Sequence, residues 1–573
     1  MSLRVAGRAS MQHCVQSVHF LTCVLGALVT TDANFRLRGR SSLPDDLATT
    51  GAAADSVSRG HIGAWDAPQH GCGTCLPGQK PTVAVCRDDG AIRYSDWGDA
   101  SAFPLQVAAG RSLAVRLCNV GNAVVDGALI FTDAPSPIVG SVGRGAHIRI
   151  DVLNSWNVAV SGVLSISGVV WETDDPHGHH GHKHHEAMGA MGHGKNRVTK
   201  EKLRLSPPSL VPTLVSGPFG DNVDVRVSMK QSANVLFQSP LSSLQVTGGA
   251  FCGTLVGATG SSLEHSYVEV EFADSGNVAG SSSSGQVSIE SGTLIGRMLQ
   301  SESIVGSTVL IHVTNASNID ARQLKVQGGS VMGSPIHTRQ ISKHAVVRLR
   351  LQHVGNFRGD ELVVHHGEVI DEMVGCEGNV VDSAVAISAT DVANAHVAVA
   401  RILGGELVDE VIDTVDITGS RLEVTLKDLA NVNASQLVNV AGELLDEVID
   451  GEDVVNSEVV VDEERVGNVR AHQLVVSDTS LVDETIDARE ARNSKFFVRL
   501  RSMASFQGDL LDISAGGTLH DEAVDVDRSG GGNFVSVSVA HVGNATGTVV
   551  GKISGDRLVE GMGPDDDVNI RRV

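Results

Sequence analysis

The amino-acid sequence predicts an all-β protein built from tandem repeats of about 37 residues. Two landmarks recur in phase over residues 318–525. The first is an asparagine, which steps by 38, 38, 37 and 37 residues through Asn318, Asn356, Asn394, Asn431 and Asn468. The second is a phrase that reads HHGEVIDEMV (365–374), GGELVDEVID (404–413), AGELLDEVID (441–450), SDTSLVDETID (477–487) and AGGTLHDEAVD (515–525). Two landmarks that recur with the same period indicate a repeat architecture.

The first element of each unit is predicted to be a half-buried strand, because apolar and polar residues alternate. Examples are HIRIDVLNSWNV (147–158), VVRLRLQHVGNF (346–357) and VSVSVAHVGNA (535–545). The Gly-Asn that follows is typical of a turn, since both residues tolerate left-handed backbone conformations. Segments such as ELVV (361–364) and QLVV (473–476) then predict a second strand.

The closing ELVDEVID block is open to two interpretations. Its apolar residues Leu407, Val408, Val411 and Ile412 fit one helical turn as well as two short strands. The equivalent blocks upstream, SGTLIGRML (291–299) and GGSVMGSPIH (328–337), carry Gly, Ser and Pro. These residues would not replace helix formers so freely, so we expect strand and turn.

Such short strands cannot bury their apolar faces alone, and stacked neighbours must share a core. We therefore expect a β-solenoid. The alternatives are serial β-sandwiches of about 75 residues each and a β-propeller, although ten or eleven units exceed the usual blade number.

Changes in composition divide the chain into seven segments. These are a signal or leader (1–34), an irregular Cys-containing leader or cap (35–110), first degenerate β repeats (111–171), a His-rich loop (172–200), irregular β repeats (201–317), regular repeats (318–525), and a terminal repeat with a tail (526–573).

Composition limits the partners and the compartment. The net charge of −23 disfavours nucleic acid and anionic lipid. Residues 15–29 resemble the apolar region of a secretory signal and are too short to span a membrane. We therefore predict a protein that is secreted or on the cell surface, with a protein or glycan surface as its partner. The eight cysteines are expected to be buried or free thiols, and the regular repeats, which contain only Cys376, are no disulfide scaffold.

The His-rich loop is the first candidate metal site. Its imidazoles would suit Zn, Ni or Cu, although a Gly-rich loop does not hold ligands in fixed geometry. The candidate ligands are His177, His179, His180, His182, His184, His185 and His193.

The repeated Asp-Glu pairs are a second, weaker candidate. They begin at Asp371, Asp409, Asp446, Asp483 and Asp521. Stacked carboxylates could bind calcium, but no EF-hand or calcium β-roll motif is present. Stacked like charges also repel one another, so the pairs are expected to form an exposed edge screened by counter-ions.

No sequence motif of a hydrolase, nucleotide-binding protein or metalloprotease is present, and no catalytic residue is assigned. We therefore predict a non-enzymatic structural or adhesive repeat protein that presents an acidic β surface to a partner. The alternative is a β-helical carbohydrate-active enzyme, recognised by a cleft with paired carboxylates and aromatic neighbours. A further alternative is translation of the opposite strand of a GC-rich repeat, without function, which detection of the peptide by mass spectrometry would exclude.

Overall fold

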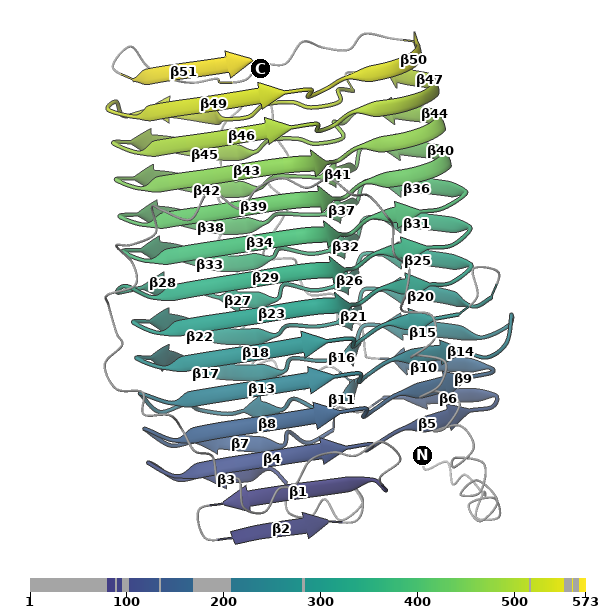
Figure 1. Ribbon diagram of the computed structural model, residues 1–573, viewed down its shortest axis with the longest axis vertical. Coiled ribbons are helices and arrows are strands. Elements are labelled where there is room, and N and C mark those ends of the chain that lie inside the picture. Colours follow the sequence, from purple (N-terminus) through teal and green to yellow (C-terminus); the bar gives the residue numbers. More distant parts are fainter. Residues whose placement is uncertain are drawn as a thin grey trace, which may run out of the picture.

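The protein is a β-solenoid of about 10 turns, and the fold predicted from the repeat is confirmed (Figure 1). The computed structural model describes residues 80–87, 90–94, 103–132, 135–167, 208–280, 284–514, 517–550, 559 and 566–572. Within these ranges every regular element is a strand. None of the described segments forms a helix with the length and hydropathy needed to cross a membrane.

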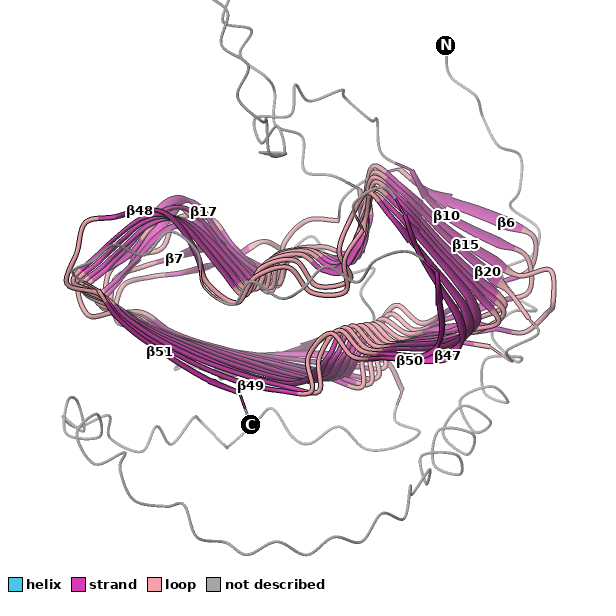
Figure 2. Cartoon of the chain, turned by 90° about the horizontal axis from the view of Figure 1, so that it is seen from above, coloured by secondary structure: helices cyan, strands magenta, loops and turns pink. Residues whose placement is uncertain are grey.

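Each regular turn passes through four sheets in the same order. In one such turn the chain runs through β39 (Arg421–Leu429), β40 (Val432–Val440), β41 (Glu443–Leu445) and β42 (Ile449–Val455). We number the sheets 1 to 4 in this order. Seen along the axis, sheet 1 forms one wall and sheets 3 and 4 form the opposite wall, which bends inward (Figure 2). Sheet 2 closes one end of this flattened ring.

Sheet 1 and sheet 2 contain the longest stacks. The other strands of sheet 1 are β2 (Gly90–Tyr94), β1 (Thr82–Arg87), β4 (Ser112–Cys118), β8 (His147–Leu153), β13 (Asp224–Lys230), β18 (Tyr267–Ala273), β23 (Thr308–Ala316), β29 (Val346–Val354), β34 (Ala384–Val392), β43 (Glu458–Val466), β46 (Lys495–Arg501), β49 (Phe534–Ala540) and β51 (Asp567–Arg572). The other strands of sheet 2 are β5 (Ala123–Val125), β6 (Ala128–Phe131), β9 (Val158–Val160), β10 (Val163–Ser167), β14 (Val235–Phe237), β15 (Ser243–Thr247), β19 (Val278–Ala279), β20 (Gln286–Glu290), β24 (Ile319–Asp320), β25 (Gln323–Gln327), β30 (Phe357–Arg358), β31 (Glu361–His365), β35 (Ala395–His396), β36 (Val399–Leu403), β44 (Val469–Ser477), β47 (Phe506–Ser514) and β50 (Ala545–Val550).

Sheet 3 and sheet 4 form the inward-bending wall. The other strands of sheet 3 are β11 (Ser209–Val211), β16 (Ala250–Cys252), β21 (Thr293–Ile295), β26 (Ser330–Met332), β32 (Glu368–Ile370) and β37 (Glu406–Val408). The other strands of sheet 4 are β3 (Leu105–Val107), β7 (Val139–Val142), β12 (Val215–Ser216), β17 (Val256–Glu264), β22 (Leu299–Val305), β27 (Ile336–Thr338), β28 (Ile341–Ser342), β33 (Val374–Val381), β38 (Ile412–Thr418), β45 (Ile486–Arg492) and β48 (Asp525–Ser529).

Successive turns stack in parallel and in register, so that equivalent residues form columns. In sheet 1, Leu422 of β39 lies opposite Val459 of β43, and Val424 lies opposite Val461. These side chains join one continuous apolar core. Parallel columns of this kind exclude the serial sandwiches and the propeller, because those folds are built from antiparallel strands. They also confirm strand and turn, rather than helix, for the ELVDEVID block.

The turn at each asparagine differs from the expected one. The left-handed residues are the one before the asparagine, such as Ala430 (φ 53°), and the one three places before it, such as Asp428 (φ 54°). Asn431 itself is not left-handed in this turn. The asparagine therefore serves through its side chain and not through its backbone freedom.

Steric constraints explain why a glycine opens the ELVDEVID block. A Cβ on Gly442 would lie 2.4 Å from the carbonyl oxygen of Gly405, and a Cβ on Gly405 would lie 2.5 Å from that of Gly367. Any side chain at this position would push adjacent turns apart. The glycine thus permits close stacking at the entrance to sheet 3.

The N-terminal end of the stack is built differently from the rest. Strand β1 is antiparallel to both β2 and β4, whereas the pairs from β4 to β51 in sheet 1 are parallel. Cys86 in β1 and Cys118 in β4 are disulfide-bonded, which corrects the expectation of thiols for these two residues. Cys252 and Cys376 are buried free thiols, as expected for the stacked turns.

Candidate functional site

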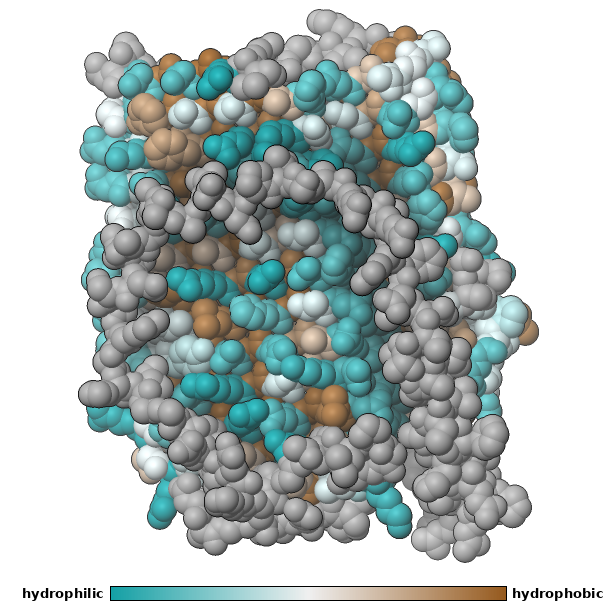
Figure 3. Space-filling model, viewed as in Figure 1, coloured by the Kyte–Doolittle hydropathy of each residue, from teal (hydrophilic) through white to brown (hydrophobic). Residues whose placement is uncertain are grey.

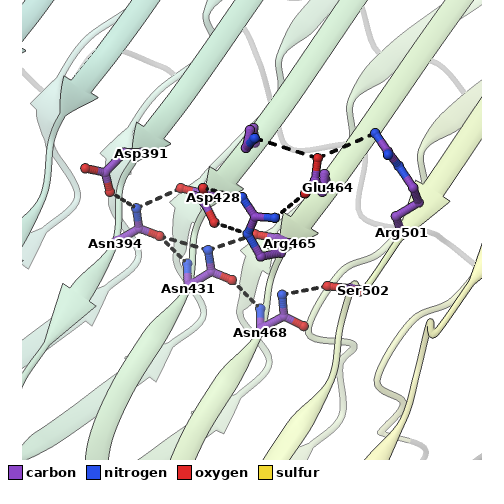
Figure 4. A network of polar contacts seen from close by, with 10 residues as sticks. Asp391, Asn394, Asp428, Asn431, Glu464, Arg465, Asn468, Arg501 and Ser502 are labelled. Atoms are coloured by element: carbon purple, nitrogen blue, oxygen red, sulfur yellow. Dashed lines mark hydrogen bonds and ion pairs between the residues drawn. The ribbon is translucent and has the colours of Figure 1, made fainter. Parts of the chain in front are cut away.

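Two rows of polar side chains run along the solenoid axis, and they correspond to the two landmarks of the sequence. The first is the asparagine row at the junction of sheets 1 and 2, which consists of Asn122, Asn157, Asn234, Asn277, Asn318, Asn356, Asn394, Asn431 and Asn468. The side-chain oxygen of each asparagine accepts a hydrogen bond from the backbone N–H of the equivalent residue in the next turn, which is the next asparagine or, after Asn468, Ser505. These bonds measure 2.9 Å from Asn431 to Asn394 and 2.9 Å from Asn468 to Asn431 (Figure 4).

The side-chain amide of the asparagine makes a second contact with the following turn. Nδ2 of Asn394 donates to the carbonyl oxygen of Asp428 at 2.7 Å, and Nδ2 of Asn431 donates to that of Arg465 at 2.8 Å. Each asparagine thus satisfies backbone groups that the tight turn leaves without a sheet partner. This is a structural role, and it accounts for the asparagine landmark.

An open groove of about 1480 Å³ follows the asparagine row. Its outer side chains change from turn to turn, as His353, Asp391, Asp428 and Arg465 show. Asp428 and Arg465 form an ion pair, and this contact raises the pKa of Arg465 above its ordinary value. A hydrophilic strip parallel to the long axis is visible on this face between sheets 1 and 2 (Figure 3).

The second row, the acidic corner, lies where sheet 3 passes into sheet 4. Its Asp-Glu pairs fall between strands, so that Asp446 and Glu447 separate β41 from β42. The wall bends inward in this region (Figure 2), and the apolar residues on both sides, Leu445 and Val448, are fully buried. The corner comprises Glu368, Asp371, Glu372, Glu406, Asp409, Glu410, Asp413, Glu443, Asp446, Glu447, Asp450, Asp483, Glu484, Asp487, Asp521, Glu522 and Asp525.

The acidic corner contradicts the expectation of an exposed edge. Glu484 and Glu522 are each only 6% exposed, and the Asp of each pair is partly buried. The Oε2 atoms of Glu443, Glu447 and Glu484 are buried without a hydrogen-bond partner. The inward bend of the wall is the reason, because it places the pairs in a concave surface rather than on a rim.

Two further columns of carboxylates join the predicted pairs. Glu368, Glu406 and Glu443 stand three residues before the Asp, and Asp413, Asp450 and Asp487 stand four residues after it. Neither column was predicted from the sequence to be part of a site. Their signal was present, because each recurs at a fixed offset from the Asp-Glu pair within the repeated phrase.

The carboxylates form groups that bridge adjacent turns. In one group, oxygens of Glu410, Asp413 and Asp450 all lie within 4.8 Å of one another. The same holds one turn later for Glu447, Asp450 and Asp487, so Asp450 belongs to both groups. Parallel groups are formed by Glu406, Asp409 and Asp446 and by Glu443, Asp446 and Asp483.

Burial and mutual repulsion strongly perturb these carboxyl groups. Burial, followed by the neighbouring carboxylates, raises the pKa of Glu410 and of Glu484 to about 10. The same causes raise the pKa of Glu368 and of Glu372 to about 8. Among the described residues, the charged groups with the largest influence on the pKa of Glu484 are all carboxylates, namely Asp483, Asp487, Asp525 and Glu522.

Among the described residues, a cationic side chain influences only the first turn of the corner. Arg297 occupies the position equivalent to Glu410 in an earlier repeat, and its charge lowers the pKa of Asp371 and of Glu372 against the larger effect of burial. Burial lowers the pKa of Arg297. Beyond this end, the ion pairs of Arg489 involve Glu452 and Asp453, which are not part of the corner.

The sequence-predicted histidine ligands His177, His179, His180, His182, His184, His185 and His193 lie outside the described residues. The metal site predicted there stays a prediction. The structure instead gathers the residues of the weaker candidate, the Asp-Glu pairs, into a defined cluster.

Comparisons of the chain with protein-family models, with curated proteins and with solved structures found no match.

Proposed function

We propose that this chain is a non-enzymatic structural or adhesive repeat protein that uses the acidic corner to bind a cationic partner. The observation that carries the proposal is the stacking of carboxylates at equivalent positions of five successive turns, from Asp371 to Asp521. A cationic partner would favour the ionised form of these carboxyl groups and would then meet regularly spaced negative charge, since neighbouring strands are about 4.8 Å apart. A partner that carries a row of positive groups would complement it.

The rigidity of the scaffold supports this function. Parallel stacking in register and the asparagine row fix the distance between successive carboxylates, so the partner meets an ordered charge pattern. The disulfide-bonded Cys86 and Cys118 support an oxidising location, which is the secreted or cell-surface environment predicted from the N-terminal segment.

Binding of the full-length protein to immobilised poly-lysine, poly-glutamate and neutral dextran tests the proposal. We expect binding to poly-lysine that weakens with salt. A triple variant of the corner, Asp413→Asn, Asp450→Asn and Asp487→Asn, should bind poly-lysine at least tenfold more weakly.

The matched control removes three acids from sheet 1, through Glu423→Gln, Glu458→Gln and Asp462→Asn. It has the same formal charge change and should retain affinity for poly-lysine. If this control loses as much affinity as the corner variant, net charge and not the corner binds the partner, and the proposal is wrong.

The alternative of a β-helical carbohydrate-active enzyme predicts turnover. Incubation with soluble polysaccharides and measurement of reducing ends would detect it. Turnover that the corner variant keeps would place the function elsewhere on the solenoid.

A further inference from the structure

Within the described part of the chain, the acidic corner gathers more carboxylates than there are cationic side chains to balance them. Within the three-residue groups, two side chains come from one turn and the third from the next, as with Glu447, Asp450 and Asp487. A ligand held by such a group would therefore bridge adjacent turns. Positive charge is the only property of a small ligand that would relieve the repulsion among all three.

A second observation is independent of the clustering. Glu484 is more than nine-tenths buried, and its Oε2 atom has no hydrogen-bond partner. Its carboxylate interacts with Asp487, which belongs to the group above. A buried carboxylate oxygen that lies among other carboxylates and has no hydrogen-bond donor is suited to bind a cation.

We propose that the acidic corner binds Ca²⁺, with Glu447, Asp450 and Asp487 as one site and Glu484 beside it. This inference uses the same surface as the proposed function and adds the ion that the surface holds. The preceding turn offers an equivalent site at Glu410, Asp413 and Asp450.

The geometry favours calcium over the other common divalent ions. Two oxygens that bind one Ca²⁺ at about 2.3–2.6 Å can lie up to about 5.2 Å apart, which matches groups whose oxygens lie within 4.8 Å. Mg²⁺ requires a nearly ideal octahedron at about 2.0–2.1 Å. An all-carboxylate site also suits hard cations better than Zn²⁺ or Cu²⁺, which prefer nitrogen and sulfur.

Three carboxylates do not complete the coordination of calcium. The ion takes about 6–8 oxygens, whereas three carboxylates supply at most six. Water or oxygen atoms of a partner would occupy the remaining positions. The corner would then also bind an anionic or hydroxyl-rich partner through the ion, which extends the range of partners beyond cationic ones.

Isothermal titration calorimetry of the full-length protein, first stripped with chelator, tests the inference. We expect Ca²⁺ binding with a Kd on the order of 10⁻⁴ M and a rise in Tm, with weaker effects from Mg²⁺. The single variants Glu447→Gln and Asp487→Asn should each weaken Ca²⁺ binding at this site at least tenfold. Circular dichroism verifies that both variants fold.

The control variant Glu423→Gln, on sheet 1, should bind Ca²⁺ like the unmodified protein. The inference is overturned if the stripped protein gives neither heat nor a Tm change with Ca²⁺, or if Asp487→Asn binds as the unmodified protein does. Corner-dependent binding of poly-lysine without Ca²⁺ binding would remove this inference and leave the proposed function. Ca²⁺ binding without binding of poly-lysine would remove the proposed function and leave this inference.

Discussion

The asparagine row and the acidic corner share one period but differ in how their polar groups are satisfied. In the row, each side chain donates to and accepts from its neighbours, as Asn431 does with Asn468 and Arg465. In the corner, equivalent carboxylates accumulate, and the Oε2 atoms of Glu447 and Glu484 have no hydrogen-bond partner. An amide can bond to copies of itself because it carries both donors and acceptors, whereas ionised carboxylates have acceptors only. Stacking therefore stabilises one row and strains the other.

The largest effect is expected from breaking the asparagine row. Asn431→Ala removes the acceptor for the N–H of Asn468 and the donor to the carbonyl oxygen of Arg465, both in a partly buried turn. We expect a loss of roughly 3 to 4 kcal/mol in the free energy of unfolding, since orphaned backbone groups add to the lost bonds. Urea unfolding measures it. Asn433→Ala, at an exposed position of the adjoining groove, should change stability by less than about 0.5 kcal/mol.

The second prediction concerns Glu463, a lone buried carboxylate in sheet 1. It stands between Leu426 and Leu500 in its column, and burial raises its pKa to about 8. Because the folded-state pKa exceeds the unfolded value, the stability contributed by this group is complete below about pH 4.5 and is lost as the pH rises to about 8. Glu463→Leu should therefore stabilise the protein by roughly 3 kcal/mol at pH 7 and flatten this decline.

Unfolding by urea at pH 5, 7 and 9 measures the effect of Glu463→Leu. The neutral variant Glu463→Gln should remove the same pH dependence without the full gain in stability at pH 7. If stability declined equally steeply with pH in the unmodified protein, in Glu463→Leu and in Glu463→Gln, the assignment of this decline to Glu463 would be wrong.

The third prediction distinguishes the two rows by the sign of the change in stability that a mutation causes. Because the pKa of Glu484 is raised to about 10, this group must bind a proton on folding at neutral pH, and Glu484→Gln removes that cost; in chelator the variant should therefore be more stable by about 2 kcal/mol. In millimolar Ca²⁺ the gain should shrink or reverse, because the unmodified corner then holds its ion. Differential scanning calorimetry with and without Ca²⁺ measures both. Equal stabilisation in the two buffers would argue against an ion beside Glu484.

The smallest effect is expected at His520, a buried residue in the last regular turn. Burial lowers its pKa to about 4. Since the unfolded state takes up the proton first, the protein loses stability as the pH falls from about 6.5 to about 4. His520→Leu should remove about 1 kcal/mol of this loss at pH 5.5, as thermal unfolding at pH 5.5 and pH 7.5 would show. A difference of the same size at both pH values would indicate packing rather than titration.

The fold could be predicted from the sequence because the repeat period and the alternation of apolar and polar residues both result from the stacking of strands. The columns of Val and Leu in sheet 1 follow directly from segments such as VVRLRL. The asparagine landmark was located correctly but was interpreted as backbone freedom. Its hydrogen bonds link Asn394, Asn431 and Asn468 across turns, and such contacts exist only once the turns are stacked.

The acidic corner was harder to predict because its burial depends on the inward bend of the wall. Alternation alone places Asp446 and Glu447 on a surface. The signal of the bend was the pair of apolar residues on each side, Leu444 with Leu445 and Val448 with Ile449, all of which are buried. Two consecutive buried residues break the period of a strand and indicate a change of direction.

The parallel stacking of equivalent turns also has an evolutionary consequence. The strand pairs from β4 to β49 in sheet 1 join a turn only to the turn before it and the turn after it. A duplicated segment of about 37 residues would find the same neighbours above and below. The length of the protein, and with it the number of carboxylate groups, can therefore grow or shrink by one turn through unequal recombination without redesign of the core.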